Sequence, residues 1–393
     1  MNSKKGAEIL AGKINNDRLC KSVCSDGTGI VNPMEPKRTA RLEYAFSAEG
    51  LYRSLQKCIS GTSWKTSVAS FELNGIKKCT QLSEKLLEGT YEPKTLRTFE
   101  VTRPKKRECT AIGIYDRVFQ RSLNDNVIYP EMTKHLIKEN CACQKGKGTD
   151  YARNLLKRDL FRLNYNQRYK IDDQRSGYAL CLDIRGYYPN MRHDVAIRQF
   201  EKYLDPSEFK FVKMIINHQY PREVGFTPGS QLVQIAGISA LNEIDHYIKE
   251  QLHIKYYIRY MDDFILIHKS KEYLNRCRLI IKEKLDELGF ELNESKTQLI
   301  NIYRQPIPFL GFVFQIYPSG KIVMNIKATK FREQKRRLRR LAKHVRYNHI
   351  SIKVFDDIAN QCIRYLDKNC SSRRYPNEYK NLYLELRKDM YHG

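Results

Sequence analysis

Two adjacent aspartates, Asp262 and Asp263, stand in the middle of an apolar and aromatic run, KYYIRYMDDFILIH (residues 255–268). The flanking residues are of the β-branched and aromatic types that favour strands, so the run predicts a hairpin with Met-Asp-Asp at its tip. Carboxylates that are buried together repel each other unless a cation neutralises them. Because aspartate is also a common turn residue, the pair taken alone is explained equally simply as an ordinary turn.

A third aspartate, Asp183, ends another short apolar run, YALCLDI (residues 178–184), about eighty residues upstream. If both runs are strands of one sheet, three carboxylates come together. Mg²⁺ prefers carboxylate oxygens, and a pair of such ions about 3.5–4 Å apart can activate a hydroxyl group and stabilise a leaving group. The residues therefore predict a site for two Mg²⁺, with Mn²⁺ as a possible substitute.

The charge of the chain points to a polyanionic partner. The 393 residues contain 70 Lys and Arg against 44 Asp and Glu, a formal net charge of +26. The run KATKFREQKRRLRRLAKHVR (residues 327–346) concentrates ten of these cations with a single glutamate. Such a cationic helix fits a phosphate backbone, whereas a membrane-surface helix would carry more bulky apolar residues.

In that run, residues at helical spacing predict two faces. The expected narrow apolar seam consists of Phe331, Leu338, Leu341 and Val345. The expected nucleic-acid-binding cations are Lys335, Arg336, Arg339, Arg340 and Lys343. A merely soluble basic protein, or one that binds acidic lipid, is the alternative.

The sequence offers no sign of a membrane or an oxidising compartment. No stretch of about 18 apolar residues is present, and the N-terminal residues lack the apolar core of a signal peptide. Eleven cysteines, an odd number, are spread along the chain without paired zinc-ligand motifs. We therefore expect a cytoplasmic protein with reduced thiols and no membrane span.

Helical and strand-like segments alternate along the chain, which predicts an α+β fold with a sheet that carries helices on one side. Helical spacing covers residues 41–95, 115–140, 150–165, 194–217, 230–252 and 271–288. Strand-like runs include residues 178–184, the Met-Asp-Asp hairpin and residues 297–315. The basic TFEVTRPKKRECTAI segment (residues 98–112) predicts either a strand pair or a strand and a loop.

YMDD in a hydrophobic hairpin resembles the signature of reverse transcriptases, and the order of other segments resembles that family over about residues 75–345. The segments are RPKKREC (103–109), KGKGTDYA (145–152), CLDIRGYYPNM (181–191), GFTPGSQLVQ to LNEID (225–245), LGFELNESKTQL (288–299) and FLGF (309–312). The resemblance implies a right-hand polymerase fold. Its expected parts are an N-terminal extension (1–40), fingers with the start of the palm (41–175), a palm with an antiparallel sheet (176–315) and a basic helical thumb (316–393).

The resemblance also implies roles for individual residues. Asp183 and Asp262 would hold the metal ions with support from Asp263, and Lys296 would lie near the pyrophosphate as a general acid. The remaining expected contacts are Lys105 and Arg107 with the triphosphate, Tyr188 beneath the sugar as a gate for dNTPs, and Gly229 and Gln234 against template and nucleotide. For Tyr188 the simpler alternative is a core tyrosine beside Tyr187, and for Lys296 a solvated lysine.

The function expected from these features is RNA-directed DNA polymerisation, which adds dNTPs to a primer 3′-hydroxyl on an RNA template and yields a DNA product. The chain most resembles stand-alone bacterial enzymes, since it contains no recognisable RNase H or His-Asn-His endonuclease segment. We expect a dedicated, structured non-coding RNA as template in an antiphage defence system. A diversity-generating retroelement, template-independent or protein-primed DNA synthesis, and a non-catalytic RNA-binding protein stay open. A protein partner or a homo-oligomer also stays open.

Overall fold

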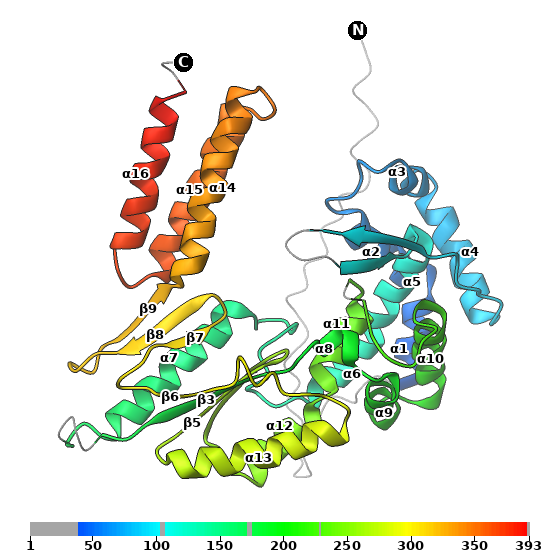
Figure 1. Ribbon diagram of the computed structural model, residues 1–393. Helices are drawn as coiled ribbons and strands as arrows, with labels where there is room; N and C mark the ends of the chain where they lie inside the picture. Colours follow the sequence, from blue (N-terminus) through cyan, green and yellow to red (C-terminus); the bar gives the residue numbers. More distant parts are fainter. Residues whose placement is uncertain (1–37, 103–106, 171–174, 228, 391–393) are drawn as a thin grey trace, which may run out of the picture. The chain divides into compact units, whose positions relative to one another are not determined.

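The aspartate hairpin and the strand that ends at Asp183 belong to one four-stranded antiparallel sheet (Figure 1). The computed structural model describes residues 38–102, 107–170, 175–227 and 229–390. In the sheet the strand order is β4-β5-β3-β6. The strands are Tyr256–Tyr260 (β4), Asp263–His268 (β5), Tyr178–Asp183 (β3) and Gln298–Asn301 (β6).

The residues of this sheet alternate between two hydrophobic cores, as expected for strands buried on both faces. Leu180 and Leu182 of β3 lie in one core, whereas Ala179 lies in the other. Against the first face lies α13, the helix Lys271–Glu287, which contacts β3 and β5. Against the second face lies α7, the helix Thr149–Tyr165, which contacts β4.

Further helices complete the first core. They are α8 (Tyr187–Asn190), α9 (His193–Tyr203), α10 (Pro206–Gln219), α11 (Gln231–Ser239) and α12 (Asn242–Glu250). The expected helix over residues 194–217 is divided between α9 and α10, because Asp205 and Glu208 form a capping box and Pro206 occupies the first turn of a new helix.

The part of the chain before β3 is mainly helical. Besides α7, its helices are α1 (Arg38–Phe46), α2 (Ala48–Ile59), α3 (Thr66–Glu72), α4 (Gly75–Leu87), α5 (Ile114–Leu123), the π-helical turn Asn124–Ile128 and α6 (Tyr129–Lys134). Between α4 and α5, the strands Arg97–Val101 (β1) and Arg107–Ala111 (β2) form an antiparallel pair. Of the two forms that the sequence predicts for this basic segment, the strand pair is therefore the one present.

The C-terminal part combines a small sheet with three helices. The antiparallel strands are Ile307–Phe309 (β7), Phe312–Ile316 (β8) and Ile322–Ile326 (β9). The helices are α14 (Ala328–Arg346), α15 (Ile352–Asn369) and α16 (Arg374–Lys388). In α14 the expected apolar seam faces the second core, where Phe331 and Leu338 are buried and Leu341 and Val345 are partly buried.

The predicted mixture of helices and antiparallel strands is confirmed. The helices do not lie on one side of the sheet only, because the strands are apolar on both faces and α13 and α7 cover opposite faces. The expected N-terminal extension lies outside the described residues except for its last three positions, and the boundaries of fingers, palm and thumb stay predictions. Among the helices that the structure describes, none combines the length and the apolar character needed to cross a bilayer.

Candidate active site

The three aspartates singled out in the sequence lie together at one end of the four-stranded sheet. Asp183, the last residue of β3, stands directly opposite Asp263, the first residue of β5. Residues paired in this way project to the same face with Cβ atoms about 4.5–5.5 Å apart. Because Tyr260 also pairs with Asp263, Met261 and Asp262 form a two-residue turn beside them.

Burial and mutual repulsion disfavour the charged forms of these carboxyl groups. Burial raises the pKa of Asp263 to about 7, and the charges of Asp262 and Asp183 add to this effect. Burial likewise raises the pKa of Asp262, with a contribution from Asp183. A cation placed among these groups would relieve the repulsion.

One such cation is supplied by the chain itself. The ammonium group of Lys296 lies 2.9 and 2.8 Å from the two carboxylate oxygens of Asp183. The side-chain amide of Asn293 donates to the same carboxylate at 3.0 Å, and its backbone N–H donates to the Asp183 carbonyl at 2.8 Å. The hydrogen bond to Asp183 raises the pKa of Lys296.

The sequence analysis expects Lys296 beside the pyrophosphate. In the structure its ammonium group is bonded to the carboxylate of Asp183, the first of the three aspartates. Sequence reasoning missed Asn293, although it lies in the same short segment.

The donor set fits a hard divalent cation. Within the described residues, no group of three or more His, Cys, Asp and Glu side chains is already arranged around a common metal position. Asp183, Asp262 and Asp263 nevertheless lie together at one end of the sheet, and the Lys296 ammonium group is a cation in contact with the Asp183 carboxylate. Oxygen donors of this kind are those that Mg²⁺ prefers.

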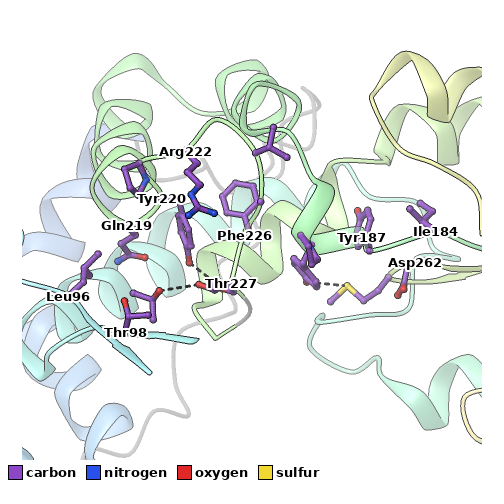
Figure 2. Close-up of a pocket in the computed structure, with 18 of the residues that line it drawn as sticks. Leu96, Thr98, Ile184, Tyr187, Gln219, Tyr220, Arg222, Phe226, Thr227 and Asp262 are labelled. Carbon is purple, nitrogen blue, oxygen red and sulfur yellow. Dashed lines mark hydrogen bonds between the residues drawn. The ribbon is translucent and has the colours of Figure 1, made fainter. Parts of the chain in front are cut away.

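A cavity of about 1040 Å³ opens beside these carboxylates. One end is lined by Asp183, Asp262 and Lys296, and the other by Thr98 of β1 and Thr110 of β2. Figure 2 shows the labelled Asp262 and Tyr187 at one side and Thr98, Gln219 and Tyr220 at the other. The cavity thus extends from the carboxylates to the strand pair of β1 and β2, and it has room for a nucleotide.

Tyr188 lies in the wall of this cavity next to the hairpin tip. Its hydroxyl donates to the sulfur of Met261 at 3.7 Å. The hydroxyl end of the ring also lies so close to Gly237 of α11 that a Cβ atom at position 237 would lie 2.5 Å from the hydroxyl oxygen. The neighbouring Tyr187 is buried and donates to the Gly237 carbonyl at 2.5 Å. Both tyrosines line the cavity, but Tyr188 is the more exposed of the two, and its hydroxyl points to the hairpin tip rather than to a backbone carbonyl.

A buried ion pair contacts the backbone of the hairpin tip through a hydrogen bond. Arg259 and Asp245 are both fully buried, with the guanidinium nitrogens Nε and Nη2 each donating to the carboxylate at 2.6–3.0 Å. The third nitrogen, Nη1, donates to the carbonyl of Met261 at 3.1 Å. Met261 has a φ of +57°, which is uncommon for a residue with a side chain, so this hydrogen bond helps to hold the turn that presents Asp262.

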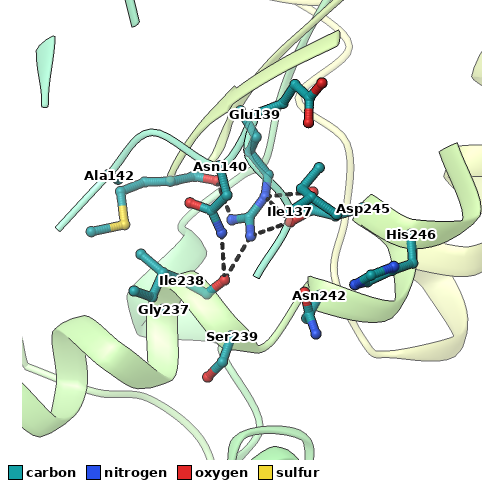
Figure 3. A network of polar contacts seen from close by, with 12 residues as sticks. Ile137, Glu139, Asn140, Ala142, Gly237, Ile238, Ser239, Asn242, Asp245 and His246 are labelled. Atoms are coloured by element: carbon teal, nitrogen blue, oxygen red, sulfur yellow. Dashed lines mark hydrogen bonds and ion pairs between the residues drawn. The ribbon is translucent and has the colours of Figure 1, made fainter. Parts of the chain in front are cut away.

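The same ion pair is tied to the surrounding chain (Figure 3). Both Arg259 and Asn140 donate to the carbonyl of Ile238, and the Tyr257 hydroxyl donates to Asp245 at 2.7 Å. Sequence reasoning missed this network. The available signal was a charged residue, Arg259, inside a run of otherwise apolar strand residues.

Other predicted site residues lie apart from the carboxylates or outside the described residues. Gly229, with φ +149°, and the exposed Gln234 of α11 are not among the described residues that line the cavity. Lys105 lies outside the described residues, and of Arg107 only the backbone, at the start of β2, is described.

The five cations predicted to bind nucleic acid lie on α14. Four of these side chains are exposed: Arg336, Arg339, Arg340 and Lys343. Lys335 is instead partly buried in an ion pair with Glu378 of α16. Lys335 therefore joins two helices in addition to carrying charge.

A family model described as reverse transcriptase (RNA-dependent DNA polymerase) matches residues 112–314 of the chain. The chain belongs to the reverse transcriptase family. The matched region contains the four-stranded sheet, the three aspartates and Lys296. Membership confirms the expected resemblance at the level of the family and, with it, the right-hand polymerase fold.

Solved structures similar to this family member include telomerases. Truncated apo telomerase from Candida tropicalis is 13% identical with a TM-score of 0.43, and the match covers 58% of this chain and 54% of that chain. Telomerase from Candida albicans with a TWJ fragment of telomeric RNA is 11% identical with a TM-score of 0.44, and the match covers 76% of this chain and 62% of that chain. Apo telomerase from Candida tropicalis is 11% identical with a TM-score of 0.41, and the match covers 77% of this chain and 65% of that chain. The chain thus spans less than two thirds of each of them. No curated protein matches it in sequence.

Proposed function

We propose that this chain adds dNTPs to a primer 3′-hydroxyl on an RNA template, with Asp183, Asp262 and Asp263 as the metal-binding carboxylates. The observation that supports this proposal most directly is the pairing of Asp183 with Asp263 across β3 and β5, with Asp262 in the adjoining turn. An arrangement that merely filled a turn would not need a third carboxylate from a distant strand.

In this proposal Asp183 and Asp262 hold two Mg²⁺, for which Mn²⁺ can substitute, and Asp263 supports the site. Bound metal ions would activate the 3′-hydroxyl and stabilise the departing pyrophosphate. Lys296 holds the Asp183 carboxylate before substrate binds, which offsets the repulsion between the carboxylates. When metal ions take its place at Asp183, the protonated ammonium group of Lys296 is free to donate a proton to the leaving pyrophosphate.

The walls of the cavity would select the nucleotide. Tyr188 lies beside Gly237 and Met261, where its ring restricts the space beside the sugar and so disfavours a 2′-hydroxyl. Lys105 and Arg107 would contact the triphosphate, since Arg binds phosphate oxygens in a fork and Lys as a point charge. Gly229 and Gln234 would contribute to the template side.

The exposed cations of α14 would hold the phosphate backbone of the template–product duplex. Arg336, Arg339, Arg340 and Lys343 project from the helix surface opposite its buried seam. Each phosphate contact contributes to affinity and makes it dependent on salt. Lys335, bound to Glu378, would contribute less directly.

The test is dNTP incorporation on a primed RNA by the full chain with Mg²⁺ or Mn²⁺. The variant Asp262→Asn should lose incorporation while its affinity for the primed RNA stays near that of the native chain. The exposed Asp357→Asn on α15 serves as the control and should leave incorporation unchanged. Continued synthesis by Asp262→Asn would refute the metal assignment, and absence of incorporation by the native chain would favour a non-catalytic RNA-binding role.

For the biological role, we propose a bacterial, cytoplasmic enzyme that copies a dedicated non-coding RNA in antiphage defence. The net charge of +26 supports a large nucleic-acid partner but does not by itself distinguish between systems. Sequencing of the RNA that co-purifies with the chain, and of any DNA joined to it, is the deciding experiment. A single structured RNA supports the proposal, whereas mutagenised copies of a repeat favour a diversity-generating retroelement. DNA made without template, or DNA attached to the protein, favours the template-independent or protein-primed alternatives.

A further inference from the structure

The outer face of α7 and of the turn that follows it carries exposed aromatic rings. Phe161 is 56% exposed, Tyr165 50% and Tyr169 87%. The opposite face of α7 is buried in the second core, where Leu156, Leu160 and their neighbours pack against the sheet. Single exposed apolar side chains are common on protein surfaces, but three of them within nine residues on one face call for an explanation.

These rings are ordered in a continuous stack. The rings of Phe161 and Tyr165 are stacked with centroids 5.9 Å apart and an interplanar angle of 23°. The guanidinium carbon of Arg168 lies 4.0 Å from the ring centroid of Tyr165 and 4.3 Å from that of Tyr169. Hydrogen bonds of 3.1 Å from Arg168 to the Tyr165 carbonyl and to the Tyr169 hydroxyl hold the arrangement. The surface is thus preorganised, and binding would require little additional ordering of these side chains.

The charge of this face is positive. Exposed Lys157, Arg162, Arg168 and Lys170 alternate with the rings. Between residues 151 and 170 the sequence contains one carboxylate, Asp159, which is 2% exposed and paired with Arg158 at 3.0 Å. None of the described residues in this stretch lines the cavity beside the aspartates. The α7 surface, defined as residues 157–170, is therefore distinct from the candidate active site.

We propose that the α7 surface binds an unpaired segment of RNA. Bases stack on exposed aromatic rings and on guanidinium planes, and neighbouring cations neutralise the phosphates. This combination fits a single strand better than a duplex, whose bases are already stacked. It also fits RNA better than a membrane surface, which would favour bulky aliphatic side chains on the exposed face.

The surface gives the chain a second contact with RNA that does not require the primer end to be in the active site. A template RNA with an unpaired region could then stay attached while its copied part moves through the cavity. Two linked contacts raise the overall affinity beyond that of either one.

The test measures the affinity of the full chain for a labelled, unstructured RNA of about twelve nucleotides, a length within the range that single-strand-binding surfaces cover. Unlabelled RNA–DNA hybrid without overhangs is added at a saturating concentration, so that it occupies the exposed cations of α14 that are proposed to bind the duplex. We expect Tyr165→Ala/Tyr169→Ala to weaken binding by about ten-fold or more at every salt concentration. We expect Lys157→Gln/Arg162→Gln to reduce the slope of log affinity against log salt by about 1.4, or about 0.7 for each phosphate that the chain no longer neutralises.

The matched control is Trp64→Ala/Lys65→Gln, because the exposed Trp64 ring also has a lysine ammonium group 5.3 Å from its centroid but stacks on no other ring among the described residues. The control should keep the native affinity, and both α7 variants should extend a short primed hybrid at the native rate. Unchanged RNA affinity in Tyr165→Ala/Tyr169→Ala would overturn the proposal, as would an equal loss in the control. Loss of binding to phosphatidylglycerol vesicles with unchanged RNA affinity would assign the surface to a membrane instead. Since the readout is RNA affinity, the result does not depend on polymerase activity.

Discussion

Gly237 lies in direct contact with the ring of Tyr188. A Cβ atom at position 237 would stand 2.5 Å from the Tyr188 hydroxyl oxygen, 2.9 Å from Cζ and 3.1 Å from Cε1. Real Cβ atoms do not approach other atoms so closely, so only glycine at position 237 leaves the ring where it is. The place of the expected sugar gate is thus set by a residue about fifty positions away in the sequence.

Replacing Tyr188 by alanine should relax the choice of sugar. Without the ring, the cavity beside Met261 has room for a 2′-hydroxyl, and discrimination between dNTPs and rNTPs should fall by about 10- to 100-fold. The measurement is the ratio of kcat/KM values for dNTP and rNTP on the same primed RNA. Tyr187→Phe, which removes only the hydroxyl that donates to Gly237, should leave the ratio near its native value.

Gly237→Ala should act through Tyr188. The added methyl group would push the ring into the cavity, so we expect KM for dNTPs to rise several-fold. In Gly237→Ala/Tyr188→Ala the added methyl has no ring to displace, so the double variant should resemble Tyr188→Ala alone. Gly177→Ala, whose Cβ would meet Ile302 and Leu163 in the core, provides a control for overpacking. Additive effects of the two changes on KM would contradict this explanation.

Breaking the buried ion pair should weaken the whole fold. Asp245→Asn leaves the Arg259 guanidinium buried without its counter-charge, and such losses are typically about 3–5 kcal/mol in the free energy of unfolding. Tyr257→Phe, which removes one hydrogen bond to Asp245, should lower that free energy by only about 1 kcal/mol. Urea unfolding measures both. The control is Glu243, which lies on the same helix as Asp245 and forms an exposed ion pair with Lys202 of α9. Glu243→Gln should change stability by less than about 1 kcal/mol.

Lys296→Met tests the role of the ammonium group. Loss of a general acid typically lowers kcat by about 10²-fold or more, and we expect a decrease of that order with little change in KM for dNTPs. Because the ammonium group no longer occupies Asp183, the Mg²⁺ concentration for half-maximal rate should also fall. Pre-steady-state incorporation at several Mg²⁺ concentrations measures both quantities. An unchanged kcat would leave Lys296 as a counter-charge of Asp183 only.

Asp356 of α15 should make part of the stability dependent on pH. The hydrogen bond from Arg387 lowers the pKa of Asp356, and the Tyr383 hydroxyl adds to this effect. A carboxyl whose pKa is lower in the folded state stabilises the fold above its unfolded pKa, about 3.9, and this contribution is lost as the pH falls through the folded pKa. The difference in Tm between the native chain and Asp356→Asn should therefore be largest near pH 6 and should shrink below about pH 4. Asp357→Asn, at the exposed neighbouring position, should show no such trend.

Much of the fold follows from local patterns in the sequence. The Met-Asp-Asp hairpin, the strand that ends at Asp183 and the basic strand pair were all predictable, because alternation and strand-favouring residues act between near neighbours. The boundary between α9 and α10 was missed although Pro206 and the capping box are themselves local. The order of the segments was enough to predict the family.

The sequence by itself determined which residue types were expected in the candidate site: three carboxylates, a lysine and a tyrosine proposed as the sugar gate. Only the tertiary structure decided that Lys296 lies on Asp183, that Gly237 positions Tyr188 and that Arg259 supports the Met261 turn. It also decided which face of α7 is buried and which presents its rings to solvent. The physical reason is that these contacts join residues far apart in the chain, and a pattern of neighbours carries no information on which distant side chains will share the same small volume.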